Sequence, residues 1–244
     1  MERKKNSAFI RFIDNEVFKI IVVYFLLISG AIWQVLDMFT EITRPAAGPI
    51  IILLSILAFW EILRKYKLPK PNKDGIIDQP NLRNNFIVYF IVVIVVSWVI
   101  ELIGVRTHSI FGTYNYNDVL RPTLYTVPVA IGFAWFLALV TSHAILQKTS
   151  RINLNGIPNL IKSVIIGFTM MFFDFLMEPA AIRLYYWTWK NDIVPLQNYF
   201  VWFLLGASLA YLGFKMRVLK IVFPNIIFHI FLAMVAYFLI IQFG

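Results

Sequence analysis

The chain has 244 residues, of which 60% are hydrophobic and only 14% are charged, with no cysteine and a net charge of +9. Soluble domains average about 45–50% apolar and about 25% charged residues, so this composition excludes a disordered chain and argues against a soluble globular domain. The lack of cysteine excludes disulfides, iron–sulfur clusters and thiolate zinc sites.

Seven apolar segments have, or nearly have, the length of about 20 residues that a membrane-spanning helix needs. They cover residues 17–36, 45–63, 85–104, 126–146, 159–178, 198–214 and 221–243. None shows the strict alternation of a membrane barrel strand, so we expect an all-α, polytopic bundle that forms one integral-membrane domain over residues 1–244. No obvious cleavage site follows the first segment, and we expect it to be retained.

The basic residues are distributed unequally between the two ends of these segments. Seventeen of the 22 Lys and Arg residues lie before or at the start of the first segment, or in the connections around residues 64–83, 148–162 and 215–220. The opposite side holds Arg44, Arg106, Arg121, Arg183 and Lys190. Positive residues stay inside, which predicts a multi-pass protein of the cell membrane with a cytoplasmic N-terminus and an outward C-terminus. The basic excess therefore serves topology, and we expect no nucleic-acid partner.

Two acidic residues fall inside apolar segments at a similar depth. At 1.5 Å per residue, Glu101 lies roughly 24 Å along the third segment and Asp174 roughly 22 Å along the fifth. Glu178 follows Asp174 at i+4 and shares its helix face, and Pro179 should then end or kink the helix. Placing an ionisable group near mid-bilayer costs about 2.5–3.5 kcal/mol, so Glu101 and Asp174 together predict a functional site. For Glu178, capping of the helix end at the headgroups is an alternative explanation.

Aromatic and polar residues gather in the outer loops beside these carboxylates. An aromatic belt at the membrane interface is the simpler explanation for Tyr185 and Trp189. Aromatic rings over an apolar cleft can also stabilise a cation through their faces. His108, His143 and His229 are isolated, and the last segment has no lysine for a retinal Schiff base. We therefore expect cross-helix hydrogen bonds from the membrane histidines, with no cofactor and no metal.

Four motifs occur in a fixed order over about residues 85–214. They are Glu101-xx-Gly104-xx-Thr107-xxx-Phe111-Gly112-x-Tyr114-x-Tyr116; Val127-Pro128 with Trp135; Asp174-xxx-Glu178-Pro179 with Trp187-Thr188-Trp189; and Pro195-xx-Asn198-Tyr199 with Trp202. Together they resemble the carotenoid biosynthesis membrane proteins, a family that includes carotenoid 1,2-hydratases of the bisanhydrobacterioruberin hydratase type. Glu178, Val201 and Gly132 stand where that family often has Asp, Gly and Pro.

The resemblance implies an enzyme that adds water to the terminal double bond of an acyclic carotenoid dissolved in the lipid bilayer. Acid protonation would give a tertiary carbocation, which water captures. The catalytic residues that it implies are Glu101, Asp174, Glu178 and Tyr114. The implied substrate-binding residues are Arg106, Thr107, Tyr116, Trp135, Trp187, Trp189 and Asn198. Glu101 and Asp174 would donate the proton and activate water, and Arg106 would pair with one carboxylate.

Two other functions remain open. A carotenoid cyclase begins with the same protonation, but a neighbouring double bond captures the cation. A small membrane transporter or receptor would use the carboxylates as proton or cation sites without changing any lipid covalently. Hydration adds the mass of one water to the pigment, and neither alternative does.

Overall fold

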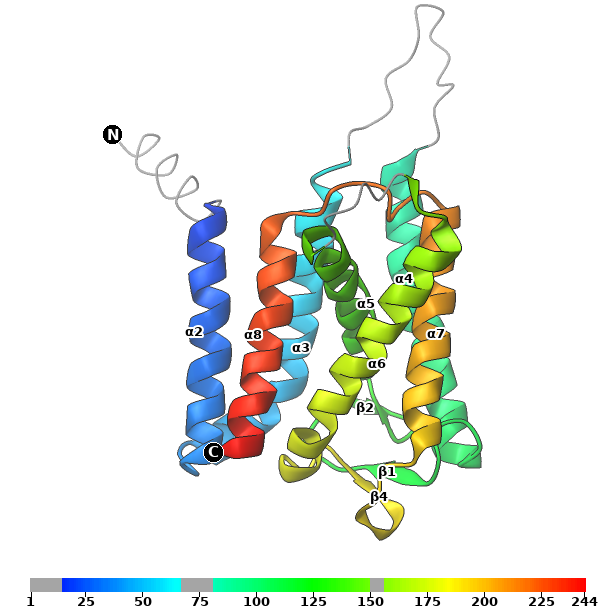
Figure 1. Ribbon diagram of the computed structural model, residues 1–244. Coiled ribbons are helices and arrows are strands. Elements are labelled where there is room, and N and C mark those ends of the chain that lie inside the picture. The colour runs from blue at the N-terminus through cyan, green and yellow to red at the C-terminus, as the bar shows by residue number, and fades with distance from the viewer. Residues whose placement is uncertain (1–14, 67–80, 150–155) are drawn as a thin grey trace, which may run out of the picture.

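The computed structural model describes residues 15–66, 81–149 and 156–244. In this part of the chain, seven helices cross the molecule in alternating directions, with the start of the first and the end of the last at opposite ends (Figure 1). The helices are α2 (Glu16–Val35), α3 (Thr40–Leu63), α4 (Leu82–Thr107), α5 (Ala130–Thr149), α6 (Asn159–Arg183), α7 (Leu196–Lys215) and α8 (Asn225–Phe243). The expected all-α class is confirmed.

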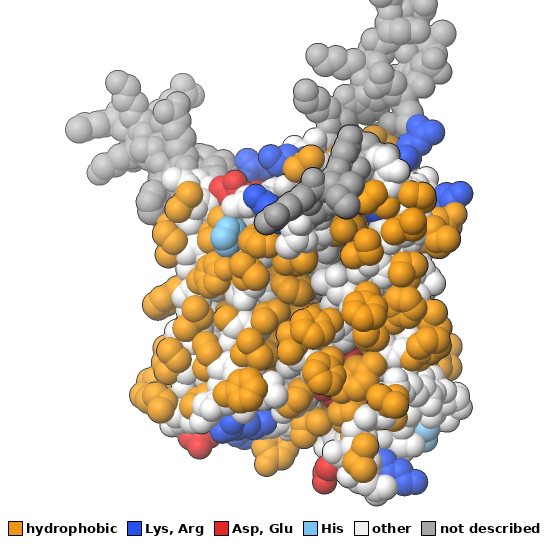
Figure 2. Space-filling view, in the orientation of Figure 1, with side chains coloured by type: hydrophobic (Ala, Val, Ile, Leu, Met, Phe, Trp, Pro, Cys, Tyr) orange, Lys and Arg blue, Asp and Glu red, His pale blue; other side chains and the backbone are white. Residues whose placement is uncertain are grey.

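Six of the seven helices are long and apolar enough to cross a membrane. The exception is α7, which matches the expected segment 198–214 but is less apolar, because its first turn contains Gln197 and Asn198 and it also contains serine and tyrosine. A seventh span is therefore not established by apolarity. Figure 2 shows a broad apolar band between two ends that carry most of the visible charge. These features are those of a multi-pass membrane protein.

The orientation in the membrane stays a prediction. Several of the basic residues on which it depends lie outside the described residues. These are Arg3, Lys4, Lys5, Arg11, Lys67, Lys70, Lys73 and Arg151.

Helix α5 lies at the centre of the bundle. It packs against α3, α4, α6, α7 and α8, and most of its side chains are buried. Its apolar character on all sides follows from this position, since a helix enclosed by other helices has no polar face. The residue that matters most below is Trp135, which is fully buried near the start of α5.

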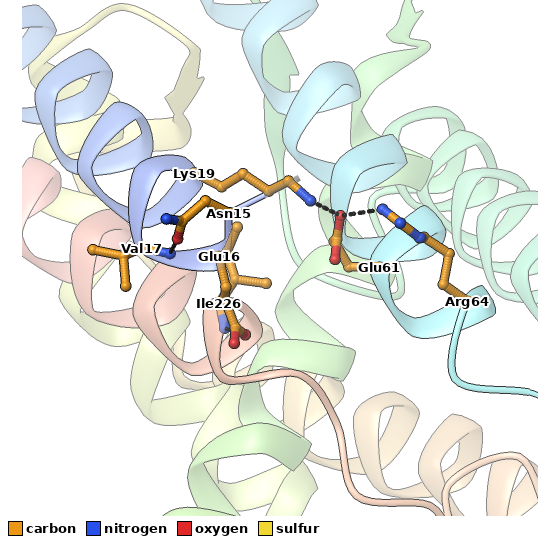
Figure 3. Close-up of polar contacts among 7 residues, drawn as sticks. All are labelled: Asn15, Glu16, Val17, Lys19, Glu61, Arg64 and Ile226. Carbon is orange, nitrogen blue, oxygen red and sulfur yellow. Dashed lines mark hydrogen bonds and ion pairs between the residues drawn. The ribbon is translucent and has the colours of Figure 1, made fainter. Parts of the chain in front are cut away.

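Polar contacts tie three helices together at the end where α2 begins (Figure 3). Asn15 caps α2 by accepting a hydrogen bond from the Val17 N–H at 2.9 Å. The Glu16 carboxylate accepts a hydrogen bond at 3.0 Å from the Ile226 N–H. This N–H lies in the first turn of α8, where the helix itself offers no acceptor. Lys19 meets Glu61 of α3 at 2.6 Å. These contacts fix the beginnings of α2 and α8 beside the end of α3.

The isolated membrane histidines behave in two ways. His229 of α8 lies 3.3 Å from the Tyr24 hydroxyl of α2, which is the expected cross-helix contact. His143 instead meets Gln147 of its own helix, and Gln147 donates to the Ile221 carbonyl. At this second position a glutamine makes the bond between segments.

At the opposite end, two short strands form a ribbon across the bundle (Figure 1). Strand β1 (Tyr114–Tyr116) pairs antiparallel with β4 (Trp187–Trp189), so that Tyr114 faces Trp189 and Tyr116 faces Trp187. Successive side chains of a strand point to opposite faces. The four aromatic residues therefore turn toward the bundle, and Asn115 and Thr188 turn away.

The remaining short elements are connectors. Strands β2 (Thr123–Leu124) and β3 (Val127–Pro128) pair just before α5, and the short helix η2 (Lys190–Asp192) follows β4. Of the two outcomes expected at Pro179, an end or a kink, the end is wrong, because α6 continues to Arg183. A proline removes one N–H, which a helix packed against neighbours tolerates. The extra turn carries the chain to the ribbon.

Glycine permits the sharp reversal between α4 and the ribbon. His108 ends α4 with a left-handed φ of 57°, and its N–H donates to the Gly104 carbonyl. Phe111 then packs directly on Gly104, where an added Cβ would lie 2.6 Å from the Phe111 Cδ2 atom. This close approach places Tyr114, three residues later, over the buried face of α4.

We therefore predict that Gly104→Ala destabilises the protein. Alanine normally improves a helix interior by about 0.5–1 kcal/mol, but here the methyl group would displace Phe111, and overpacking costs about 1–3 kcal/mol. Gly30→Ala in α2 is the matched control, because its Cβ would meet Tyr237 Cε2 at an ordinary 3.9 Å. Thermal unfolding in detergent should rank Gly104→Ala below both the native protein and the control. Equal midpoints for the two variants would contradict the packing argument.

Candidate active site

A cavity of about 70 Å³ lies between the helices and the ribbon, and three carboxylates line it. They are Glu101 of α4, and Asp174 and Glu178 of α6, which are 4%, 1% and 2% exposed. None of the described residues that line this cavity is Lys, Arg or His. In Figure 2, a small area of acidic colour lies recessed among apolar side chains in the lower half of the band. The negative groups are thus enclosed by apolar and aromatic surface.

Glu101 accepts three hydrogen bonds. Its Oε1 accepts from the Trp135 indole N–H at 2.9 Å, and its Oε2 accepts from the Tyr116 hydroxyl at 2.8 Å and from the Tyr114 hydroxyl. Burial and the neighbouring Glu101 charge raise the pKa of Tyr114 and of Tyr116 above the usual phenol range. Both phenols therefore keep their protons and serve as donors to the carboxylate.

Glu178 is held by the other strand of the ribbon. Its Oε2 accepts from the indole N–H groups of Trp187 and Trp189, each at 2.9 Å. An indole N–H can only donate, so this oxygen is the acceptor in both hydrogen bonds. Its Oε1 has one long contact, at 3.4 Å, with the Asn198 amide of α7.

Asp174 has the fewest hydrogen bonds of the three carboxylates. Its Oδ2 accepts from the Asn198 amide at 2.7 Å. Its Oδ1 is buried and has no hydrogen-bond partner among the described residues. Since buried polar atoms are nearly always paired, this oxygen is the exceptional feature of the site.

Aromatic rings build the cavity wall. Trp135 of α5 stacks on Trp202 of α7 with 3.9 Å between ring centroids and 14° between planes. Tyr114 and Trp189 lie 4.8 Å apart across the ribbon, and Tyr116 meets Trp187 edge to face at 6.0 Å. Rings in these arrangements pack rigidly and present π faces beside the carboxylates.

Nine of the eleven residues singled out from the sequence line this one cavity. They are Glu101, Asp174, Glu178, Tyr114, Tyr116, Trp135, Trp187, Trp189 and Asn198. The aromatic-belt explanation fails for Trp189, which is 4% exposed and bonded to Glu178, whereas Tyr185 is exposed as a belt residue would be. Whether these nine residues act in catalysis or in binding is not decided by their position.

Arg106 and Thr107 lie outside the cavity, contrary to expectation. Arg106 is exposed and sits over the Tyr125 ring, 5.6 Å from its centroid, and it pairs with no carboxylate of the described residues. Thr107 is also exposed and donates to the Ile103 carbonyl of its own helix. The reason is helical geometry: at about 100° per residue, neither position shares the helix face of Glu101.

Several lining residues carry no sequence signal of their own. Ile51 of α3 and Phe238 of α8 reach the cavity only through tertiary packing, and Tyr186 precedes the Trp-Thr-Trp motif without being part of it. Within the three described ranges, no group of three or more His, Asp and Glu residues is arranged to hold a metal ion.

The fold and the cavity define a multi-pass helical protein that encloses carboxylates beneath an aromatic ribbon. The chain belongs to the carotenoid biosynthesis protein family, whose model matches residues 51–243. The family resemblance noted in the sequence is thereby confirmed. The match extends from within α3 to the end of α8, and α2 lies outside it.

A curated relative is bisanhydrobacterioruberin hydratase from Haloarcula japonica (strain ATCC 49778 / DSM 6131 / JCM 7785 / NBRC 101032 / NCIMB 13157 / TR-1). It is 30% identical over 121 residues, which cover 48% of this chain and 41% of the relative. The matched region is thus less than half of that protein. No solved structure matches the chain.

We predict that Trp135→Phe destabilises the protein by about 1–3 kcal/mol, because a carboxylate oxygen of Glu101 would lose its buried donor. Thermal unfolding in detergent measures the loss. Trp60→Phe is the control, since Trp60 is 52% exposed on α3. In a Glu101→Gln background the same change should cost less, because a neutral acceptor needs the donor less. Strict additivity of the two substitutions would refute the assigned contact.

Proposed function

We propose that this protein is a carotenoid hydratase that adds water to the terminal carbon–carbon double bond of an acyclic carotenoid end. The observation that carries the proposal is the inequality of the three carboxylates: two are held by hydrogen-bond donors, and the third has an unpaired oxygen in an apolar cavity. Membership of the carotenoid biosynthesis family supports the substrate class, and the similarity to a hydratase supports the reaction.

Asp174 is the general acid in this proposal. Its unpaired Oδ1 is the atom where a proton is stabilised most easily, because the charged form would have no donor there. An alkene is a weak base, so its protonation needs a strong acid that is shielded from water, because water would otherwise take up the proton. The apolar wall around Asp174 meets that need.

Glu178 is the base that activates water. Its Oε1 has only the long Asn198 contact and is free to accept a proton, while its Oε2 is held by Trp187 and Trp189. Asn198 contacts both Asp174 and Glu178, so it orients the acid and the base relative to one another. A positioned base of this kind contributes about 10²–10⁴-fold in rate.

Glu101 stabilises the carbocation and keeps its charge throughout. The three donors that hold it compensate the cost of burying a carboxylate. A fixed negative charge and the faces of Tyr116 and Trp187 would surround the cation as it develops. Preorganised charge of this kind costs no reorganisation during the reaction.

The proposed reaction balances. The Asp174 proton forms a C–H bond at the less substituted alkene carbon, and the π electrons leave a tertiary cation at the other. Water forms the C–O bond at that cation and gives its extra proton to Glu178. The product has gained one water, and a proton passes from Glu178 back to Asp174 to complete the cycle.

The decisive experiment is the conversion of an acyclic carotenoid by the purified protein in liposomes, followed by mass spectrometry. In ¹⁸O-labelled water the product should carry one ¹⁸O, and in D₂O it should carry one non-exchangeable deuterium. A product of unchanged mass with a ring would identify a cyclase. If the pigment stays unaltered under conditions in which a related hydratase is active, the proposal that this protein is an enzyme is refuted.

Substitution separates the three carboxylates. Asp174→Asn and Glu178→Gln should each lower the rate of hydration by about 10²–10⁴-fold, as expected for loss of an acid or a base. Asp118→Asn is the matched control, because Asp118 is 85% exposed and paired with Arg121. Rates come from chromatography of the pigments. A native rate for Asp174→Asn would remove Asp174 from the mechanism.

A further inference from the structure

A second, larger cavity adjoins the carboxylate cavity. Its volume is about 230 Å³, and its walls come mainly from α2, α3 and α8. Ile51, Tyr186 and Phe238 line both cavities, so the two are neighbours that share one boundary. Gly30 of α2 forms part of the far wall, in a helix that lies outside the region matched by the family model.

The second cavity is built to hold hydrocarbon. Its wall consists mostly of apolar side chains, among them Leu27, Ala47, Leu54 and Met234. Its four amide and hydroxyl side chains form two pairs: the Gln34 amide donates to the Thr43 hydroxyl at 3.0 Å, and the Tyr186 and Tyr237 hydroxyls lie 3.3 Å apart. They therefore satisfy one another and leave an apolar interior.

The rim of this cavity faces the lipid side of the bundle. Leu26, Trp33 and Ile42 line it and are exposed large apolar side chains. An exposed apolar rim beside an apolar cavity is the geometry that admits a molecule already dissolved in the bilayer.

The size of the carboxylate cavity requires such a neighbour. A volume of about 70 Å³ accommodates a few waters or the few carbon atoms of an alkene end, and no more. A carotenoid is far longer than its reacting end. If that end reaches Asp174, the rest of the chain must leave through one of the cavity walls.

We propose that the second cavity binds the polyene chain next to the reacting end of the substrate, with Ile51, Tyr186 and Phe238 forming the opening between the two cavities. Tyr186 lies 3.3 Å from the Tyr237 hydroxyl, oxygen to oxygen, which fixes its ring at this opening. The occupant is the acyclic hydrocarbon of a carotenoid that enters from the bilayer. The inference rests on the proposed hydratase function and adds where the chain lies.

The test fills the cavity from α2. A Cβ at Gly30 fits, because its nearest neighbour would be the Tyr237 Cε2 atom at 3.9 Å. The remaining atoms of the leucine in Gly30→Leu would then extend into the cavity. Leucine is a good helix former, so the helix would be preserved. The probes are lycopene, a full-length acyclic carotenoid, and geranylacetone, a short ketone with the same isoprene end. The control is Val22→Phe, which adds bulk to the same helix at a residue that is 44% exposed.

Gly30→Leu should lower the ratio of kcat/KM for lycopene to that for geranylacetone at least tenfold, mainly through KM, and Val22→Phe should leave the ratio unchanged. An equal fall for both probes would indicate general damage, and an unchanged ratio would mean that a lipid chain or nothing occupies the cavity. Either result overturns this inference. The proposed function fails separately, if the native protein hydrates neither probe.

Discussion

Three buried carboxylates in an apolar bundle are the constraint on which the rest of the structure depends. A buried carboxylate without donors is prohibitively unstable, so each one must be supplied from nearby elements. The suppliers are the β1–β4 ribbon, Trp135 of α5 and Asn198 of α7. Helices α4 and α6 place the carboxylates, and the ribbon together with α5 and α7 supplies the donors that offset the cost of burying them. The bundle and the ribbon are therefore one cooperative unit.

This dependence explains the Tyr-x-Tyr and Trp-Thr-Trp motifs. A strand turns every second side chain to the same face, and only that spacing lets one short strand deliver two donors to one carboxylate. Strand β1 serves Glu101 on α4, and β4 serves Glu178 on α6. The antiparallel register sets which rings lie opposite one another, so a shift of one strand by one residue would turn its two rings away from the bundle.

Much of this arrangement could be predicted from the sequence, because helical rise is regular. It placed Glu101 and Asp174 at one depth, and the i+4 spacing placed Glu178 on the face of Asp174. Helical rotation turns Arg106 and Thr107 to other faces of α4 than Glu101, so closeness to Glu101 in the sequence does not bring them to the cavity. The helix expected at α7 is present, but its membrane span stays a prediction, because polar residues near its start lower its apolarity.

What the sequence could not supply is contact between distant segments. Nothing near Ile51 or Phe238 indicates that α3 and α8 reach the carboxylates, because that proximity follows from how the helices pack around α5. The pairing of β1 with β4 joins residues more than seventy positions apart in the chain. Strands of three residues also have too little length for their alternation to stand out from that of a loop.

The residue types alone would make the three carboxylates equivalent, and their surroundings make them unequal. Glu101 and Glu178 receive donors from rings that are themselves locked by packing, and Asp174 shares a single amide with Glu178. An acid and a base that act on one alkene must differ in how they hold a proton. None of the described cavity residues is Lys, Arg or His, so the carboxylates differ in the number of hydrogen-bond donors that each receives. In the proposed mechanism, five rings and one amide thus set the division of labour among the carboxylates. None of those rings lines the larger apolar cavity, whose boundary with the carboxylate cavity is formed by Ile51, Tyr186 and Phe238. The donors to the carboxylates and the boundary toward the apolar cavity therefore come from different side chains.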